Sequence, residues 1–296
     1  MQIIHSGLNI NYFDKNIRPI SKVASGDTVW VEVQDCYNGQ IKTSKDRRSN
    51  IDKNIIDCCT GPIEVMGSQA GDTLCVEIKK IIVDRQGIMI IAPGLGMLGD
   101  KITEERTKIV SITRNKIRFA KNCQLPITPM VGVIGVAPQQ GKQHCSLPGK
   151  HGGNLDTKII TNGSKVFLPV FVSGALLALG DLHAGMGDGE TSGTGIEISG
   201  RICMKITVLK NKAIKGPIVK TKESIYFLQS GKHFAQTVKE VLTRATQYIM
   251  EKNGCDFIEA YFLVSCMCDL QISQIVNARL TLRIKIPKRI LQNDDL

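Results

Sequence analysis

The sequence predicts a mainly β protein, with a β-sandwich or barrel-like body and a C-terminal portion that combines helix and strand. Two observations support this fold class. Many short apolar runs are separated by Gly, Pro and Asn, as in sandwiches and barrels. One long stretch, 232–252, instead repeats its apolar residues at helical spacing. With 296 residues, 42% of them hydrophobic, the chain is long enough to bury a sizeable core.

Two segments show most clearly the alternation expected of half-buried strands. Residues 27–35 place Val29, Val31 and Val33 on one face, and residues 72–84 repeat the pattern. Each segment is introduced by a Gly-Asp pair, which is typical of a turn before a strand. Further strand-like runs are 87–92, 108–113, 116–120, 132–137, 164–172, 196–210 and 280–287.

The helical part of the chain begins at about residue 232. Gly254 is a natural stop for the helix predicted over 232–252. Asp256 then precedes a second apolar run, and Glu259 follows it by three residues, which is the spacing of a capping box. We therefore expect a second, shorter helix directly after the first.

The patterns suggest three regions along the chain. They are an N-terminal β region at 1–120, a β region at 121–213 that carries two glycine-rich segments, and an α+β portion at 214–296 that packs on the body. The alternative is that the three interleave as one catalytic unit.

Composition excludes several classes of protein. The net charge is +11, but the basic residues are scattered and aromatics make up 5% of the chain, so we expect no nucleic-acid partner. No run approaches the roughly 20 apolar residues of a membrane span. The ten cysteines lack CxxC spacing, and the start of the chain lacks the order of a secretory signal. We expect reduced thiols and a cytoplasmic protein.

The segment "GDLHAGMGDGE" holds the densest set of possible ligands. The spacing of Asp181 and His183 sends both side chains to one side of an extended strand. The glycines that follow would let the loop bring Asp188 and Glu190 back toward the histidine. Histidine with carboxylates suits zinc or a similar divalent ion, and a carboxylate off the metal could act as general base.

Two further segments place polar residues beside glycines. In "PGKHGGNLD", His151, Asn154 and Asp156 surround a glycine pair whose main-chain N–H groups could stabilise an oxyanion. In "VQDCYNGQ", Asp35 ends a predicted strand. Asp35 could equally be a structural turn residue, and His183 could be a buried core histidine. From these patterns alone, the prediction is a metal-dependent enzyme of unknown reaction.

Taken together, the motifs resemble the acetamidase/formamidase family. The resemblance rests on "TGPIEVMGSQAGDTLCVEI", "GVIGVAPQQG", "PGKHGGNLDTKIITNGSKVFLPVFVSGALLALG", "GDLHAGMGDGETSGTGIEISG" and "IEAYFLVSCMCDLQISQIVN", in this order along nearly the whole chain. It implies hydrolysis of a small aliphatic amide, acetamide or formamide, to carboxylate and ammonia. It also implies a mainly β fold, a homodimer or larger homo-oligomer, and a divalent metal, zinc or calcium.

The resemblance and the local patterns together assign roles to ten residues. The expected metal ligands are His183, Asp181, Asp35 and Asp156. The expected catalytic residues are Glu190, Asp188 and His151, with Gly152, Gly153 and Asn154 binding substrate.

Two other functions stay open at this point. One is a cysteine-dependent amidase, because Cys36 follows Asp35 and Cys145 lies near His151 in the sequence. The other is a β-sandwich protein that binds a metal without catalysing a reaction.

Overall fold

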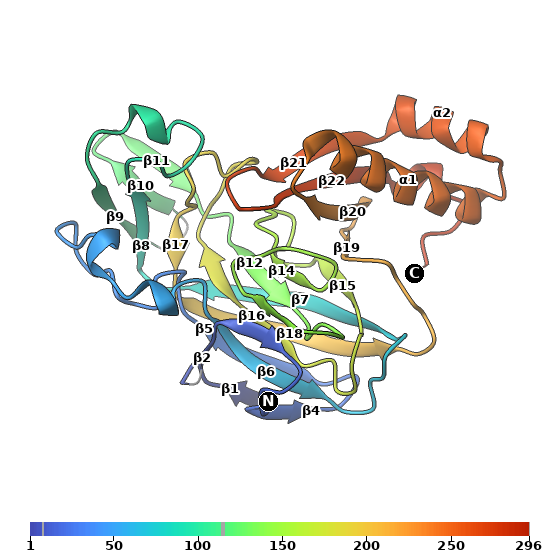
Figure 1. The fold of residues 1–296 in the computed structure, drawn as a ribbon, viewed down its shortest axis with the longest axis horizontal. Coiled ribbons are helices and arrows are strands. Elements are labelled where there is room, and N and C mark those ends of the chain that lie inside the picture. Colours follow the sequence, from blue (N-terminus) through green and yellow to red (C-terminus); the bar gives the residue numbers. More distant parts are fainter. Residues whose placement is uncertain (8, 114–115, 296) are drawn as a thin grey trace.

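A computed structural model describes residues 1–7, 9–113 and 116–295 of the chain (Figure 1). Within these ranges two large β-sheets form most of the molecule, and two α-helices lie in the C-terminal part. The predicted fold class, mainly β with an α+β C-terminal portion, is confirmed. No helix in the described ranges is long and apolar enough to span a membrane.

The first sheet runs from the N-terminus to the C-terminal portion. All its pairings are antiparallel except the first. Its nine strands, in spatial order, are β1 (Gln2–Ile4), β5 (Thr28–Val33), β18 (Gly200–Leu209), β7 (Thr73–Val83), β15 (Lys165–Pro169), β19 (Ile218–Lys220), β20 (Ser224–Gly231), β22 (Leu280–Pro287) and β21 (Asp269–Gln274).

The second sheet has eleven strands and a branch at β6. The main path is β11 (Cys123–Pro126), β10 (Lys116–Ala120), β9 (Arg106–Thr113), β8 (Gln86–Ile91), β17 (Glu197–Ile198), β16 (Leu177–His183), β12 (Met130–Gly135) and β14 (Gly152–Asn154). The branch contains β6 (Cys59–Val65), which pairs with β16, β2 (Asn9–Ile10) and β4 (Ser21–Val23). Outside this sheet, β3 (Tyr12–Asp14) pairs with β13 (Lys142–His144).

The main hydrophobic core joins the two sheets. On β5 the predicted alternation is observed, because Val29, Val31 and Val33 are all buried. They belong to one apolar cluster with residues of β16, such as Leu177 and Leu179, on the other sheet. β16 is buried along its whole length, so a polar residue on this strand lies inside the molecule.

The two helices cover β20 and β22 at one end of the first sheet (Figure 1). α1 (Phe234–Asn253) ends at Gly254, which adopts the left-handed conformation (φ 64°) expected of a C-terminal glycine. α2 (Phe257–Met267) begins at Asp256, whose side chain accepts a hydrogen bond from the Glu259 amide (2.9 Å). Both predicted helix boundaries are therefore confirmed. The remaining helical turns are short 3₁₀ segments at Arg48–Asn50, Lys53–Ile55, Gly99–Lys101 and Lys288–Ile290.

The turn before β7 is held by the carboxylate of Asp72. It accepts hydrogen bonds from the amides of Gln69 (2.8 Å) and Asn211 (3.0 Å) and from Lys210 Nζ (2.6 Å). Burial raises the pKa of this carboxyl, but Lys210 and the two amides outweigh burial and hold the pKa below its usual value. The Gly71-Asp72 signal in the sequence thus marks a turn whose aspartate is buried.

We expect Asp72→Asn to lower the free energy of unfolding at pH 7 by about 1–3 kcal/mol, because hydrogen bonds to a charged acceptor are lost. Because the folded-state pKa is depressed, the wild-type advantage is present above the unfolded pKa of about 4 and is lost as pH falls through the folded value. Urea denaturation at several pH values measures this. Asp27→Asn is the control, since Asp27 lies in the exposed Gly-Asp turn and its carboxylate accepts one hydrogen bond from the described residues, that of the Ala24 amide. Equal losses in both variants would contradict the argument.

Candidate active site

The site begins at the end of β16, where Asp181 and His183 are both buried in the second sheet. Asp181 Oδ1 lies 3.3 Å from His183 Nε2. The predicted closeness is observed, but the strand is not regular here, because Asp181 has a left-handed backbone (φ 55°). A local distortion of β16 therefore brings the two side chains together.

Glu197 lies on the other side of the histidine. Its Oε2 is 3.1 Å from His183 Nε2, and its Oε1 accepts hydrogen bonds from Gly195 N (2.7 Å) and Thr194 Oγ1 (2.8 Å). Gly195 is required for this packing, because a Cβ at that position would lie 2.4 Å from His183 Nδ1. The chain after the glycine-rich loop thus fixes both the imidazole and a second carboxylate.

Asp156 approaches from the loop after β14. Asn277 Nδ2 donates to its Oδ2 (2.9 Å), and Asn154, with its amide nitrogen turned toward the carboxylate, donates to Oδ1 (2.8 Å). Gly132 on β12 leaves room for this arrangement, because a Cβ there would lie 2.7 Å from both Asp156 Oδ1 and Asp181 Oδ2. The two amides therefore orient Asp156 toward the other acidic residues.

The loop after His183 brings Glu190 back to the site but not Asp188. Glu190 is buried, and its carboxylate lies within 4.8 Å of ligand atoms of Asp156 and His183. Asp188 instead pairs with Arg283 (2.7 Å) and Lys158 (3.0 Å) outside the cavity. The sequence predicted that the loop brings both Asp188 and Glu190 close to His183, and the structure shows this for Glu190 but not for Asp188.

These groups line a cavity of about 240 Å³. Its acidic walls come from Asp156, Asp181, Glu190, Glu197 and Asp57. The other lining residues are Cys36, Tyr37, Arg48, Ile56, Leu95, Ser146, Leu147, Asn154, Gly193, Val276, Asn277 and Ala278. A cavity of this size fits a small substrate, and residues distant in sequence enclose it.

The crowded carboxyl groups shift one another's protonation. Burial raises the pKa of Asp181 to about 6, with a contribution from Glu197, and raises that of Asp156 to about 7, with a contribution from Asp181. Burial and Asp156 raise the pKa of Glu190 well above its usual value. Burial lowers the pKa of His183, but Glu197 and Asp181 outweigh it and raise the net value. The cluster therefore favours protons or a cation at its centre.

Backbone strain is concentrated at the same cluster. Asp57, Asp156, Asp181 and Glu190 all have positive φ, between 38° and 55°. This conformation is uncommon for residues other than glycine and tends to be retained where function requires a particular side-chain direction. Four carboxyl groups are thus held in place by unusual backbone conformations.

Two groups of residues in the described chain have the arrangement of a metal site. One is Asp156, His183 and Glu190, and the other is Cys36, Asp181 and Glu197. His183 Nδ1 is buried without a partner in the described chain, and Nε2, Asp181 Oδ1 and Glu197 Oε2 lie at ion-pair distance from one another but make no hydrogen bond of good geometry there. Unpartnered imidazole and carboxylate atoms are the donors that a divalent ion would use, so the residues present fit a metal.

Several predicted site residues lie elsewhere. Asp35 accepts hydrogen bonds from the amides of Tyr37 (2.9 Å) and Gly39 (3.3 Å) and from the Ser199 hydroxyl (3.1 Å). It does not line the cavity. His151 lines a different cavity.

The glycine pair after His151 packs closely in the sheet. A Cβ on Gly152 would lie 2.2 Å from the Ile134 oxygen, and one on Gly153 would lie 2.3 Å from the Leu147 oxygen. The Gly152 amide donates to Gly149 O (3.1 Å). Close backbone packing is therefore sufficient to explain why both positions hold glycine.

Sequence reasoning missed Glu197, Asp57 and Asn277. Glu197 carried a usable signal, because it is an acidic residue between Ile196 and Ile198 in a strand whose flanks are apolar. Asp57 and Asn277 lie in loops without periodicity. No local pattern could place them beside β16.

Comparisons with known proteins agree with this fold. An acetamidase from Bacillus halodurans has a solved structure that matches with a TM-score of 0.95 and 38% identity over 97% of both chains. The putative formamidase C869.04 of Schizosaccharomyces pombe is 28% identical, covering 86% of this chain and 82% of that protein. The class of protein is an amide hydrolase. The profile of the Acetamidase/Formamidase family matches residues 5–145 and 141–293, and the chain belongs to this family.

We expect Gly132→Ala to lower kcat/KM for the best amide substrate at least tenfold, because the new methyl group displaces Asp156 or Asp181. A displacement of about 1 Å in an active site can cost on the order of 100-fold. Gly187→Ala is the matched control, since a Cβ there meets nothing within 4 Å. Circular dichroism checks that both variants fold. Wild-type activity in folded Gly132→Ala would contradict the role of the glycine.

Proposed function

We propose that the protein hydrolyses a small aliphatic amide, acetamide or formamide, to the carboxylate and ammonia in the acidic cavity. Family membership supports amide hydrolysis. The observation that carries the choice of site is that five carboxyl groups line a cavity of about 240 Å³, with the buried imidazole of His183 behind them, 3.3 Å from Asp181 and 3.1 Å from Glu197. A substrate with few atoms supplies little binding energy of its own, so a preformed site is an advantage.

We assign a divalent cation, zinc, to His183 and Asp156, with Asp181 as a further ligand. His183 and Asp156 belong to one of the two residue groups that have the arrangement of a metal site, and Asp181 belongs to the other. The His183 nitrogens and Asp181 Oδ1 are buried without a hydrogen bond in the described chain. Imidazole favours zinc, whereas an all-oxygen set favours calcium or magnesium. When bound, such an ion supplies a Lewis acid that polarises the amide carbonyl and acidifies water.

Glu190 is the residue that we propose moves the proton. A general base must take a proton from water as oxygen adds to the carbonyl carbon, and the departing nitrogen must gain a proton as the C–N bond breaks. Glu190 lies beside His183 and Asp156. Its raised pKa suits it to donate a proton to the departing nitrogen. Asn154 and Asn277 hold Asp156 in a fixed orientation during both steps.

An ammonia-release assay on formamide, acetamide and propionamide tests the proposal. We expect turnover of at least one of the two smaller amides, loss of activity after exhaustive chelation, and recovery with Zn²⁺ while Ca²⁺ restores less. Elemental analysis of the purified protein gives an independent measurement of the metal. Absence of ammonia from every amide, with zinc added, would contradict amide hydrolysis. Activity that survives chelation would contradict the metal assignment alone.

Variants of the two acids in the returning loop separate their roles in the same assay. Glu190→Gln should lower kcat by about 100-fold or more, in the range of a lost general acid–base group. Asp188→Asn should change kcat by less than tenfold but lower Tm, because the buried Arg283 loses its carboxylate partner. The opposite order of effects on kcat would assign proton transfer to Asp188.

The cysteine-dependent alternative has one point of support, since Cys36 lines the cavity. Burial raises the pKa of the Cys36 thiol well above its usual value, and Glu197 and Asp181 raise it further. A thiol that stays protonated is a poor nucleophile. Cys145 is fully buried, with its Sγ 3.4 Å from Ile10 O in a small apolar cluster. Neither cysteine is suited to attack an amide.

We expect Cys36→Ser to retain amidase activity within about tenfold of the wild type. Serine keeps the size of the side chain, whereas loss of an essential nucleophile typically costs several orders of magnitude. Cys145→Ser is the control for a buried cysteine outside the cavity. Complete loss of turnover in folded Cys36→Ser would favour the covalent mechanism.

A further inference from the structure

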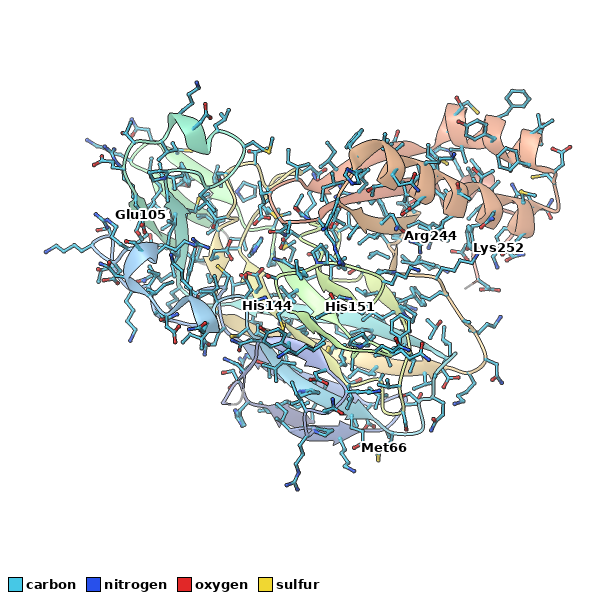
Figure 2. The ribbon with its side chains drawn as sticks, viewed as in Figure 1. Met66, Glu105, His144, His151, Arg244 and Lys252 are labelled. Atoms are coloured by element: carbon cyan, nitrogen blue, oxygen red, sulfur yellow. The ribbon has the colours of Figure 1, made fainter. Side chains whose placement is uncertain are left out.

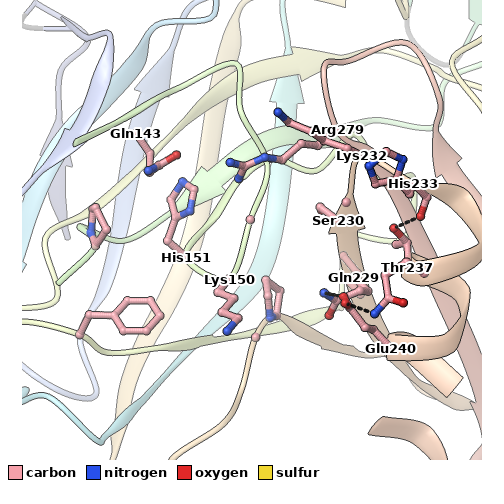
Figure 3. A pocket seen from close by; sticks show the side chains of 18 of the residues that line it. Gln143, Lys150, His151, Gln229, Ser230, Lys232, His233, Thr237, Glu240 and Arg279 are labelled. Carbon is pink, nitrogen blue, oxygen red and sulfur yellow. Dashed lines mark hydrogen bonds between the residues drawn. The ribbon is translucent and has the colours of Figure 1, made fainter. Parts of the chain in front are cut away.

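A second cavity, of about 540 Å³, shares no lining residue with the acidic one. It lies between β13, which carries Gln143, and the segment around His151 on one side and the start of α1 on the other (Figure 3). Figure 2 places His151 beneath the C-terminal helices, in the body of the protein. Nothing in the proposed amide hydrolysis uses this cavity.

The charged residues that line this cavity are mostly basic. Lys150, Lys232 and Arg279 contribute three cations. In the described chain Glu240 is the one acidic lining residue. Both its oxygens are already occupied, because Gln229 Nε2 and Gln236 Nε2 each donate to one of them at 2.8 Å. Among the contacts of the described residues, neither lysine head group has a carboxylate partner.

His151 adds a buried polar group at the wall of the same cavity. It is 4% exposed, and its Nε2 has no hydrogen-bond partner in the described chain. Its Nδ1 and Arg279 Nη1 both flank Gly149, at 3.2 Å and 3.4 Å from the position of a Cβ on that residue. Burial lowers the pKa of His151 to about 4, and Arg279 adds to the effect. Arg279 and His151 are therefore close together without a neutralising anion.

The N-terminus of α1 faces the cavity from the other wall. His233, Gln236 and Thr237 all line it, and Figure 3 shows His233 and Thr237 together with Ser230 and Lys232. His233 is the N-cap residue but makes no side-chain capping bond, and the first turn holds no acidic residue. The first N–H groups of a 20-residue helix are left for another acceptor, and the helix dipole favours a negative charge there.

We propose that this cavity binds a small oxyanion of the phosphate class, either inorganic phosphate or the phosphate end of a small metabolite. Three cations, the exposed amides of α1 and the buried imidazole of His151 supply donors from two opposite walls. Phe171, Pro217 and Leu228 line the remainder and could pack against an organic group. This site stands on its own observations and does not depend on the reaction at the acidic cavity.

Calorimetric titration of inorganic phosphate into the full-length protein, at constant ionic strength, tests the proposal. We expect saturable binding of one phosphate per chain. The double variant Lys150→Gln with Lys232→Gln should weaken it at least tenfold, because two charge-assisted contacts are lost. Lys239→Gln is the matched control, since Lys239 is an exposed α1 residue that does not line the cavity. Thermal denaturation should show a rise in Tm with phosphate in the wild type and a smaller rise in the double variant.

Acetate and glucose 6-phosphate serve as comparison probes in the same titration. Acetate should bind at least tenfold more weakly than phosphate, and tighter binding of glucose 6-phosphate would identify the organic ester as the better ligand. Absence of saturable phosphate binding would overturn the proposal. So would an equal loss of affinity in Lys239→Gln, because it would reflect the general positive charge of the surface. Acetate binding as tight as phosphate would overturn the assignment to the phosphate class.

Discussion

Burial of His183 between two carboxylates is the interaction on which the rest of the site depends. Asp181 and Glu197 contact the same ring nitrogen, and neither is exposed to solvent. Buried like charges repel unless protons or a cation compensate them. The close packing at Gly132 and Gly195 follows from this constraint, because a side chain at either position would displace the carboxylates or the imidazole.

The C-terminal portion is tied directly to this centre. Arg283, which is 1% exposed, donates to Asp188 and to the hydroxyls of Thr157 and Ser273. Thr157 follows Asp156, and Asn277 contacts the carboxylate of Asp156 itself. The strands β21 and β22 and the loop between them therefore help to hold the loops that carry the acidic residues. This explains why Asp188 points away from the cavity, since a buried guanidinium needs a carboxylate partner.

The segment 147–154 lies between two cavities of opposite charge. Leu147 and Asn154 line the acidic cavity, whereas Lys150 and His151, between them in the chain, line the basic one. The tightly packed glycines after His151 are where the chain passes from one wall to the other. A cation and an anion could thus be held close together on opposite sides of one loop, each where the local field favours it.

The sequence by itself determined the fold class, the helix boundaries and the closeness of Asp181 and His183. Alternation on β5 and the caps at Gly254 and Asp256 are local features, so they can be read without tertiary contacts. Asp181 and His183 are two residues apart, so their closeness is also local, although the left-handed backbone at Asp181 produces it and not regular strand alternation.

Tertiary structure alone decided which other residues join them. Glu197 and Asp57 reach the cavity through strand pairing and loop packing, and Asp188 is drawn away by a strand about 95 residues later. Local spacing carries no information on contacts of this length, because they depend on how the two sheets pack across a shared core. Which acidic residues distant in sequence lie near His183 therefore depends on the tertiary fold.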